Sequence, residues 1–213
     1  MSANASTVHV VDDDRLFRTS VARLLRRSGY QVELYESADR LLEASPGAGP
    51  ACILLDVRMP GLSGPELQSC LAERDNVLPI IFLTGDGDLP TAIRAIKAGA
   101  EDFLTKPVPK KVLIDALERA LARYRQTRAR AERLAAMRST VATFTPRQRE
   151  VFDLMVRGKM NKQIAHDLQT AERTVKIHRH AVMQKLNVRS LAEAVSIAEQ
   201  LGMLESSRAG QNG

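Results

Sequence analysis

Five short and almost uniformly apolar runs alternate with amphipathic stretches over the first 120 residues, and no other sequence feature constrains the fold as strongly. Such runs predict strands buried on both faces, because a strand with one wet face would alternate apolar and polar side chains. The stretches between them have apolar side chains at helical spacing. Serial strand–helix units predict an α/β domain with a doubly wound, five-stranded parallel sheet. The predicted strands are 8–11, 31–35, 52–55, 79–83 and 102–104.

The rest of the chain has a purely helical pattern. Residues 116–139 are unusually rich in arginine, and we interpret them as the last helix of the first domain continuing into a linker. A solvated charged face suits this linker better than coiled-coil pairing between two copies, because the heptad is broken at Arg128. The predicted domains are 7–121, a linker helix at 122–142, and 143–206.

The second domain is predicted to be an all-α module of four helices. Capping boxes begin at Thr145 and Ser190, where a Gln or Glu three residues later completes the pattern of a helix start. A short helix at 161–168, a three-residue turn and a longer helix at 172–186 have the proportions of a helix-turn-helix. The other two helices are expected at 146–157 and after Ser190.

Charge is segregated between the two predicted domains. Residues 1–121 hold 14 basic and 17 acidic side chains, net −3, whereas residues 122–213 hold 17 and 8, net +9, which recovers the total of +6. The basic half suggests a polyanionic partner such as nucleic acid or an anionic membrane surface. The hydrophobic content of 44% excludes disorder over most of the length.

The sequence is typical of a cytoplasmic protein without a membrane segment. Its longest apolar runs, such as Ile80–Leu83, are far shorter than the roughly 20 residues that a membrane helix needs. The first seven residues lack the basic and apolar regions of a secretory signal. Cys52 and Cys70 lack metal-ligand spacing, so we expect reduced thiols.

Polar residues follow four of the predicted strands directly. The first ends in Asp12 and Asp13, the third in Asp56, the fourth in Thr84 and the fifth in Lys106. Ligands of open parallel sheets bind beyond the carboxyl ends of the strands. Clustered carboxylates repel one another unless a cation intervenes, and their oxygens suit Mg²⁺. With a lysine and a hydroxyl available to a phosphoryl oxygen, this edge suits phosphoryl transfer to a carboxylate.

The first domain resembles a CheY-like receiver domain of a two-component response regulator, which has a flavodoxin-like fold. The matching segments are Val11-Asp12-Asp13-Asp14, Leu54-Leu55-Asp56-Val57-Arg58-Met59-Pro60-Gly61, Phe82-Leu83-Thr84-Gly85, and Lys97-Ala98-Gly99-Ala100 through Lys106-Pro107. The resemblance implies that Asp56 accepts a phosphoryl group from the phosphohistidine of a sensor histidine kinase. It also implies a Mg²⁺ site made of Asp12, Asp13, Asp56 and the backbone carbonyl of Arg58.

Further roles follow from the same resemblance. Lys106 and Thr84 would contact the phosphoryl group, Phe103 would be the aromatic switch residue, and the Lys106–Pro107 peptide would be cis. From the residues themselves, we expect Asp14 to be a helix N-cap or a favourable first-turn charge. Gly85-Asp86-Gly87 predicts a turn.

The helix predicted at 172–186 has the two faces that a major-groove reader needs. Val175, Val182 and Leu186 lie on one face, with His178 close to it as a structural residue. Residues at three-to-four spacing on the opposite face are predicted to read bases: Arg173, Lys176, Ile177 and His180. Basic side chains placed to reach phosphates are Lys162, Arg179, Lys185 and Arg189.

The second domain resembles the LuxR-type (GerE) helix-turn-helix. The matching segments are Thr145-Pro146-Arg147-Gln148-Arg149-Glu150-Val151, Asn161-Lys162-Gln163-Ile164-Ala165, Thr174-Val175-Lys176-Ile177-His178 and Lys185-Leu186-Asn187-Val188-Arg189-Ser190. Receiver and module together resemble the NarL/FixJ family, and residues 182–191 resemble its FixJ branch. The resemblance implies that the last helix pairs two modules on a pseudopalindrome. Thr170 departs from the usual apolar turn residue and is expected either to loosen packing there or to serve as a cap.

The sequence therefore predicts a transcriptional regulator that binds double-stranded promoter DNA and is switched by phosphorylation of Asp56. Phosphorylation is expected to promote a homodimer. One alternative is a phosphate-independent DNA-binding regulator that uses the receiver for dimerisation. A second is an aspartate-nucleophile phosphatase, which we disfavour because Asp56 is followed by Val57-Arg58 and not by a general acid two residues on. We therefore do not expect an enzyme.

Overall fold

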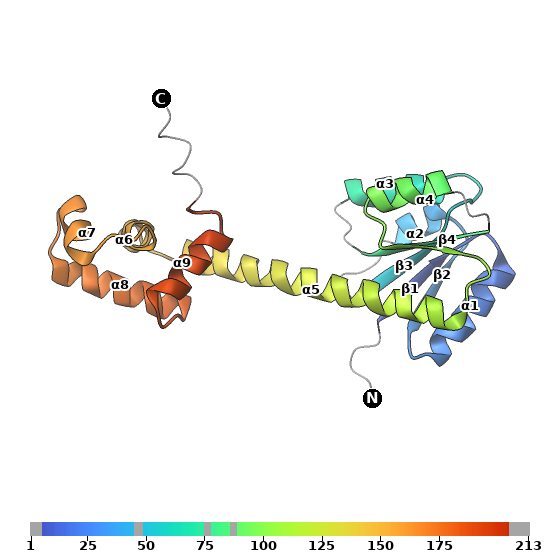
Figure 1. Cartoon of the computed structure of the whole chain (residues 1–213), viewed down its shortest axis with the longest axis horizontal. Helices are drawn as coiled ribbons and strands as arrows, with labels where there is room; N and C mark the ends of the chain where they lie inside the picture. Colours follow the sequence, from blue (N-terminus) through green and yellow to red (C-terminus); the bar gives the residue numbers. More distant parts are fainter. Residues whose placement is uncertain (1–5, 45–48, 75–77, 86–88, 205–213) are drawn as a thin grey trace, which may run out of the picture. The chain divides into compact units, whose positions relative to one another are not determined.

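The computed structural model describes residues 6–44, 49–74, 78–85 and 89–204 (Figure 1). The chain forms two compact units, one up to Arg128 and the other from Ala129 onward. Among the described residues, no helix is both long and apolar enough to span a bilayer. The turn predicted at Gly85-Asp86-Gly87 lies outside the described residues from Asp86 onward.

The first unit contains a five-stranded sheet whose neighbouring strands are all parallel. Its order is β2-β1-β3-β4-β5, as predicted for a doubly wound domain. β4 begins at Ile80 and not at the predicted Pro79, because proline has no N–H to give to a strand ladder. The strands are β1 Thr7–Val11, β2 Gln31–Tyr35, β3 Ala51–Asp56, β4 Ile80–Thr84 and β5 Asp102–Thr105.

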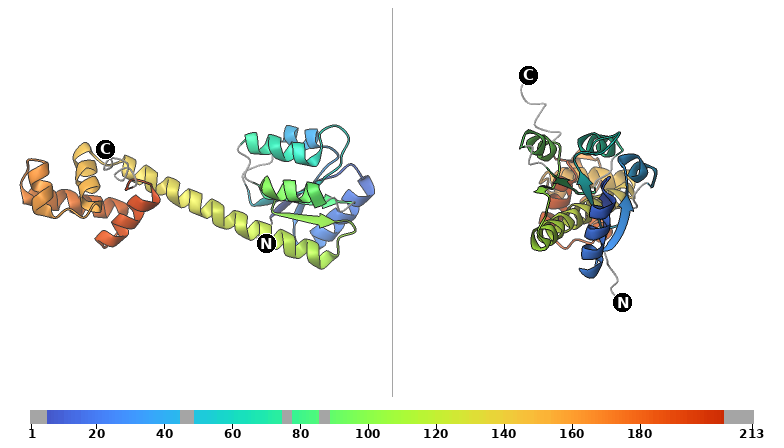
Figure 2. Two further views of the ribbon diagram at one scale, coloured as in Figure 1. Left: turned by 45° about the horizontal axis from the view of Figure 1, so that its top comes forward. Right: turned by 90° about the vertical axis from the view of Figure 1, so that its right-hand side faces the viewer.

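Helices cover both faces of this sheet (Figures 1 and 2). α1 (Arg15–Arg27) and α5 (Lys110–Ala142) lie on one face, and α2 (Ala38–Ala44), α3 (Gly64–Glu73) and α4 (Leu89–Lys97) lie on the other. Each face has its own apolar core, because the side chains of a strand alternate between faces. Leu54 packs with the core of the α1 and α5 face, and Leu55 with the opposite one. Both are fully buried.

α5 is one unbroken helix of 33 residues. Its first half presents Leu113, Leu117 and Leu121 to the sheet, all nearly fully buried. Beyond Tyr124 most of its side chains are exposed up to Thr140. The helix therefore includes the whole of the predicted linker.

The second unit contains α6 (Pro146–Val156), α7 (Asn161–Asp167), α8 (Glu172–Leu186) and α9 (Leu191–Gln200), as predicted for the all-α module. α6 and α7 end one residue earlier than predicted, at the caps Arg157 and Leu168. Buried side chains from all four helices form one core, among them Phe152, Ile164, Val182 and Ala198. Thr145 and Ser190 accept the predicted capping hydrogen bonds.

Thr170 lies in the turn between α7 and α8, where backbone hydrogen bonds close the end of α7. Gln169 has φ of +47°, and the N–H groups of Gln169 and Thr170 donate to the carbonyls of His166 and Ala165. This is a Schellman motif, in which a left-handed residue closes the end of a helix. The backbone N–H of Thr170 therefore caps the end of α7, and Ala171 is the N-cap of α8, which begins at Glu172.

Candidate functional site

The sheet register brings the predicted acidic residues to one edge. Val11 pairs with Leu55, so that Asp12 and Asp56 leave neighbouring strands at the same level. Thr84 pairs with Thr105, which places Lys106 directly beyond it. β1 and β3 are also the strands between which the order of a doubly wound sheet reverses, where ligands bind.

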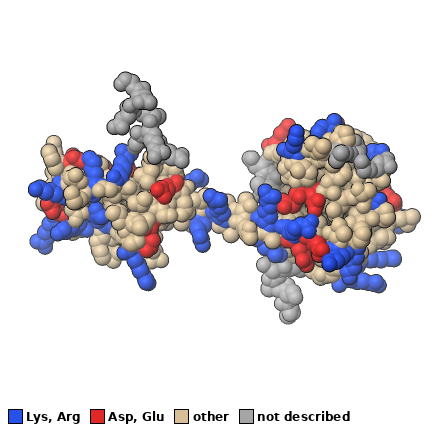
Figure 3. Space-filling view, in the orientation of Figure 1, with Lys and Arg blue, Asp and Glu red and all other residues tan. Residues whose placement is uncertain are grey.

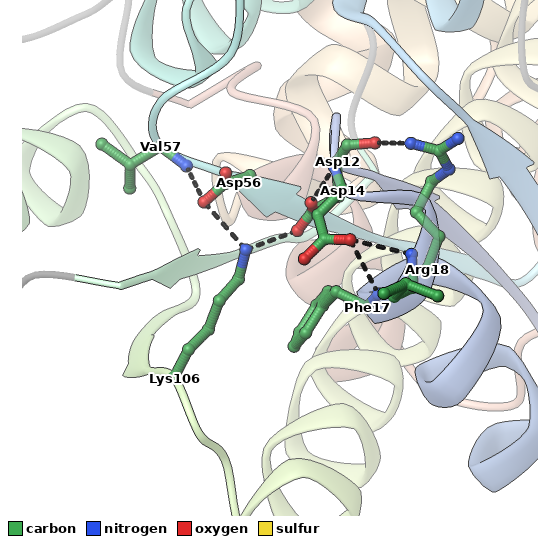
Figure 4. Close-up of polar contacts among 8 residues, drawn as sticks. Asp12, Asp14, Phe17, Arg18, Asp56, Val57 and Lys106 are labelled. Carbon is green, nitrogen blue, oxygen red and sulfur yellow. Dashed lines mark hydrogen bonds and ion pairs between the residues drawn. The ribbon is translucent and has the colours of Figure 1, made fainter.

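The ammonium of Lys106 lies between two carboxylates (Figure 4). Its Nζ is 2.5 Å from Oδ2 of Asp12 and 3.2 Å from Oδ1 of Asp56. Asp12 is 1% exposed and Asp56 is 8% exposed, so both charges are largely removed from water. Lys106 therefore offsets a repulsion that would otherwise oppose folding.

The loop after β1 is held by its own backbone and by α1. Asp14 donates its N–H to Oδ1 of Asp12 at 2.9 Å. The Asp14 carboxylate accepts from the N–H groups of Leu16 and Phe17, which confirms its N-cap role. Arg18 donates from its guanidinium to the backbone carbonyl of Asp12 at 2.5 Å. The bond from Asp14 orients the Asp12 side chain, and the bond from Arg18 holds the Asp12 backbone.

Three carboxylates converge at this edge. Oxygens of Asp12, Asp13 and Asp56 all lie within 4.8 Å of one another. Asp13 is exposed, which leaves an open side. An all-oxygen donor set with one open side fits a hard divalent cation that keeps part of its water shell.

Burial raises the pKa of the Asp56 carboxyl, and the nearby charge of Asp12 adds to this effect. The positive charge of Lys106 and the N–H of Val57, which donates to Oδ1 at 2.9 Å, act in the opposite direction. The Asp56 oxygens are thus poorly hydrated and held in one orientation. A further cation at this edge would favour the charged form that a nucleophile needs.

Among the remaining predicted receiver residues, Thr84 and Arg58 lie at or just beyond the strand ends, whereas Phe103 pairs with Phe82 inside the sheet. Thr84 is buried at the end of β4, Arg58 is exposed two residues after Asp56, and the Lys106–Pro107 peptide is cis as predicted. Phe103 is half-buried, with its ring centroid 6.2 Å from that of Phe82 in the core under α3 and α4.

Three residues without an assigned role in the sequence reading also shape this edge. A Cβ on Gly64 would lie 2.3 Å from the carbonyl oxygen of Asp56 and 2.9 Å from the Phe82 ring. Only glycine therefore lets the start of α3 lie this close to β3 and β4. Arg18 holds the Asp12 carbonyl, and Phe17 places its ring under Lys106. In the sequence, Gly64 stands inside the Ser63–Glu66 capping box and Phe17 at the apolar spacing of α1, and neither pattern indicates a contact with this edge.

The predicted base-reading face of α8 is exposed in the second unit. Arg173, Lys176 and His180 are exposed, and Ile177 is 60% exposed although it is apolar. On the opposite face Val175 and Val182 are fully buried. Figure 3 shows Lys and Arg side chains distributed over the visible face of this unit. α8 therefore presents a polar and basic stripe on a rigid core.

The four predicted phosphate contacts differ in their surroundings. Lys162 and Arg189 are exposed, whereas Arg179 is half-buried and burial lowers the pKa of its guanidinium. The Lys185 ammonium donates to the carbonyl of Thr143 at 2.8 Å and to Oε1 of Gln148 at 2.9 Å. Lys185 is exposed and its ammonium has three N–H groups, so one of them remains for a phosphate beside these two bonds.

The fold and the two sites define a class of protein: a receiver-type α/β domain joined to a helix-turn-helix module. Residues 8–118 match the response regulator receiver domain family, and residues 142–198 match the luxR family of bacterial regulatory proteins. The chain belongs to the response regulators that combine these two domains.

Relatives match over almost the whole chain. Nodulation protein W of Bradyrhizobium diazoefficiens is 42% identical, covering 95% of this chain and 89% of that protein. The response regulator protein TodT of Pseudomonas putida is 39% identical, covering 94% and 88%. The transcriptional regulatory protein FixJ of Rhizobium meliloti is 38% identical, covering 90% and 94%. TodT and FixJ are named as regulators, and together with the receiver and luxR family matches they confirm the regulatory DNA-binding class predicted from sequence.

Solved structures show the same architecture. The response regulator StyR is 44% identical with a TM-score of 0.84, covering 92% of this chain and 99% of that one. Full-length FixJ from B. japonicum is 36% identical with a TM-score of 0.59, covering 95% and 100%. The predicted fold class is thereby confirmed for both units.

Proposed function

We propose that this response regulator is switched by a phosphoryl group on Asp56 and, once switched, binds promoter DNA through α8. The observation that carries the proposal is the meeting of three carboxylates within 4.8 Å, with Lys106 bonded to two of them. Burying charged groups together costs free energy of desolvation that packing alone does not offset, so such a cluster favours a functional role.

The donor is a phosphohistidine of a sensor histidine kinase. One Asp56 carboxylate oxygen forms a bond to phosphorus while the P–N bond breaks, and the imidazole nitrogen keeps the electron pair. Lys106 then bonds a phosphoryl oxygen, and the Thr84 hydroxyl donates to another. The inward movement of Thr84 would draw the Phe103 ring further under α4, which carries the change to the surface.

Asp12, Asp13, Asp56 and the backbone carbonyl of Arg58 would hold Mg²⁺ at this edge. The ion would neutralise charge on the phosphoryl oxygens. The contribution of the chain is to aim these oxygens, which it does through the bonds that Arg18 and Asp14 make to Asp12.

For the DNA half, we propose that Arg173, Lys176, Ile177 and His180 read bases in the major groove. Lys162, Arg179, Lys185 and Arg189 would contact phosphates. Their basic side chains and the exposure of the α8 stripe support this assignment. Replacement of Lys176 by Ala is expected to relax base preference at one position of the site, measured by competition among single-base variants of the bound DNA.

The proposed functional boundaries are a receiver at 7–121, a linker helix at 122–142 and a DNA-binding domain at 143–206, whose last two residues lie outside the described part. Phosphorylation would promote a homodimer, in which α9 of each copy pairs two modules on a two-fold symmetric site. Such a protein would act in the cytoplasm and would not be an enzyme.

Phos-tag electrophoresis after incubation with acetyl phosphate tests the switch. A shifted band is expected with Mg²⁺, and no shifted band with EDTA or with Asp56→Asn. Equal labelling of the Asp56→Asn variant would reject the site. Dimerisation and DNA binding without any shifted band would favour the phosphate-independent alternative, and multiple-turnover hydrolysis of phosphate esters would favour the phosphatase.

A further inference from the structure

We propose that Phe17 is a positioning residue for phosphoryl transfer, because its ring holds the Lys106 ammonium against Asp12 and Asp56. This inference rests on the proposed role of Asp56 and adds a residue from α1 to the site.

Lys106 Nζ lies 4.2 Å from the centroid of the Phe17 ring. The same nitrogen is bonded to Asp12 at 2.5 Å and lies 3.2 Å from Asp56. The ammonium is thus enclosed by two carboxylates and one aromatic face (Figure 4). A cation over the face of an aromatic ring is attracted by the ring quadrupole, and the attraction grows as water is excluded. The Lys106 side chain is only 18% exposed.

The ring itself is fixed by the chain. The Phe17 N–H donates to Oδ1 of Asp14 at 3.2 Å, in the first turn of α1. The Phe17 side chain is half-buried against the core formed by α1, α5 and the sheet. Arg18, the next residue, bonds the carbonyl of Asp12. The same helical turn therefore contacts both the lysine and the backbone of the aspartate that the lysine bonds.

A long lysine side chain has many rotamers, and only a few place Nζ where a phosphoryl oxygen on Asp56 would lie. An aromatic face that accepts the ammonium from one side restricts these rotamers without competing for its hydrogen bonds. An aliphatic side chain at position 17 would fill the same space and lose this restriction. The ring is thus expected to act through Lys106 and not through packing alone.

The test compares Phe17→Leu with Phe17→Tyr in the full-length protein, with acetyl phosphate and Mg²⁺ as the phosphorylation system. Phe17→Leu is expected to slow labelling of Asp56 about fivefold, the rate equivalent of one such contact at a partly exposed site. Phe17→Tyr keeps the ring and should restore the rate to within about twofold of wild type. Leu16→Ala is the matched control, since Leu16 lies on the same turn and is 80% exposed.

A double-mutant cycle separates positioning from packing. In a Lys106→Met background, Phe17→Leu should have no further effect on the labelling rate, because the group through which Phe17 acts is gone. Equal slowing by Phe17→Leu in both backgrounds would overturn the proposal. If wild type is labelled on Asp56 but Phe17→Leu keeps the full rate, the role of Phe17 alone fails. Absence of labelling in wild type would overturn both inferences.

A spectroscopic readout needs no phosphorylation. The chain has no tryptophan, so Phe17→Trp places a single indole at the site. Without Mg²⁺, its emission maximum should differ between Phe17→Trp and Phe17→Trp with Lys106→Met, because an adjacent cation changes the energy of the excited indole. Lys97→Met, on the exposed surface of α4, is the control that should leave the emission unchanged. Identical emission with and without Lys106 would contradict the proposed contact.

Discussion

The two candidate sites differ in the burial and pairing of their charged side chains. In the receiver, buried carboxylates are each committed to internal partners, and Lys106 serves Asp12 and Asp56 at once. On α8, the charged side chains of Arg173 and Lys176 are exposed on a face whose opposite side is fully buried. A pocket that performs chemistry on a small group requires preorganised charge, whereas a surface that follows a polyanion requires accessible charge. Substitutions should therefore change stability at the first site and affinity at the second.

The largest expected effect on stability comes from Lys106→Met. Without the ammonium, Asp12 and Asp56 lose the cation between them, and we expect a loss of about 2 to 4 kcal/mol in the free energy of unfolding without Mg²⁺. Urea denaturation followed by circular dichroism measures this loss. Added Mg²⁺ should stabilise the variant more than wild type, because the ion replaces the missing charge. Equal stability of the two proteins in EDTA would contradict the assigned role.

Gly64→Ala tests how closely α3 must approach the phosphoacceptor strand. The added Cβ would meet the Asp56 carbonyl at 2.3 Å, and backbone cannot yield as a flexible side chain can. We expect a loss of about 1 to 3 kcal/mol, confined to the receiver transition in calorimetry. Gly49→Ala is the control, since nothing lies within 4 Å of a Cβ there. Equal stability of the two variants would show that α3 can move away from β3 without a loss in the free energy of unfolding.

Lys162→Ala and Lys185→Met test which basic residues of the second unit contact DNA phosphates. Lys162→Ala should lose one phosphate contact. The slope of the logarithm of the DNA association constant against the logarithm of the salt concentration should then be about 0.9 shallower. Lys185→Met should make the slope shallower by a similar amount and should also cost the helical unit about 0.5 to 1.5 kcal/mol of stability, because Thr143 and Gln148 lose a donor. Salt titrations of DNA binding by fluorescence anisotropy give both slopes. An unchanged slope for Lys185→Met would remove it from the proposed phosphate contacts.

The smallest effect is a pH dependence of receiver stability from His9. Burial lowers the pKa of His9 from its ordinary 6.5, against the opposing effect of Glu33. The pKa of His9 is lower in the folded state than in the unfolded state, so protonation of His9 favours unfolding. The contribution of neutral His9 to the free energy of unfolding is therefore fully present above pH 6.5 and is lost as the pH falls below it. Urea midpoints of wild type should therefore fall more steeply below pH 6.5 than those of His9→Gln. Parallel pH profiles would exclude His9 as the cause.

The fold could be predicted because its signals are local and repeated. Apolar runs such as Cys52–Leu55 indicate buried strands, and capping boxes at Thr145 and Ser190 mark helix starts that the structure reproduces. Asp12, Asp56 and Lys106 could be placed together because the carboxyl ends of parallel strands share an edge. Their convergence in the structure follows from topology and not from contacts between neighbours in sequence.

The supporting residues could not be predicted in the same way. The contact of Phe17 with Lys106 joins residues far apart in sequence, and a phenylalanine at helical spacing reads simply as core. The bonds of Lys185 to Thr143 and Gln148 could not be predicted, because basic spacing gives no information on which nearby oxygens accept hydrogen bonds from an ammonium. Sequence patterns thus identify which groups carry the chemistry, while the packing that aims them becomes visible only in three dimensions.

The most direct test of the link between the two sites is DNA affinity purification and sequencing with fragments of the genome that encodes this chain. Wild type and Asp56→Asn are compared, each with acetyl phosphate and Mg²⁺. We predict discrete enriched sites that share a two-fold symmetric motif for wild type, and at least tenfold weaker enrichment at the same sites for Asp56→Asn. Equal enrichment by both proteins would show that α8 binds DNA without reference to the acidic pocket.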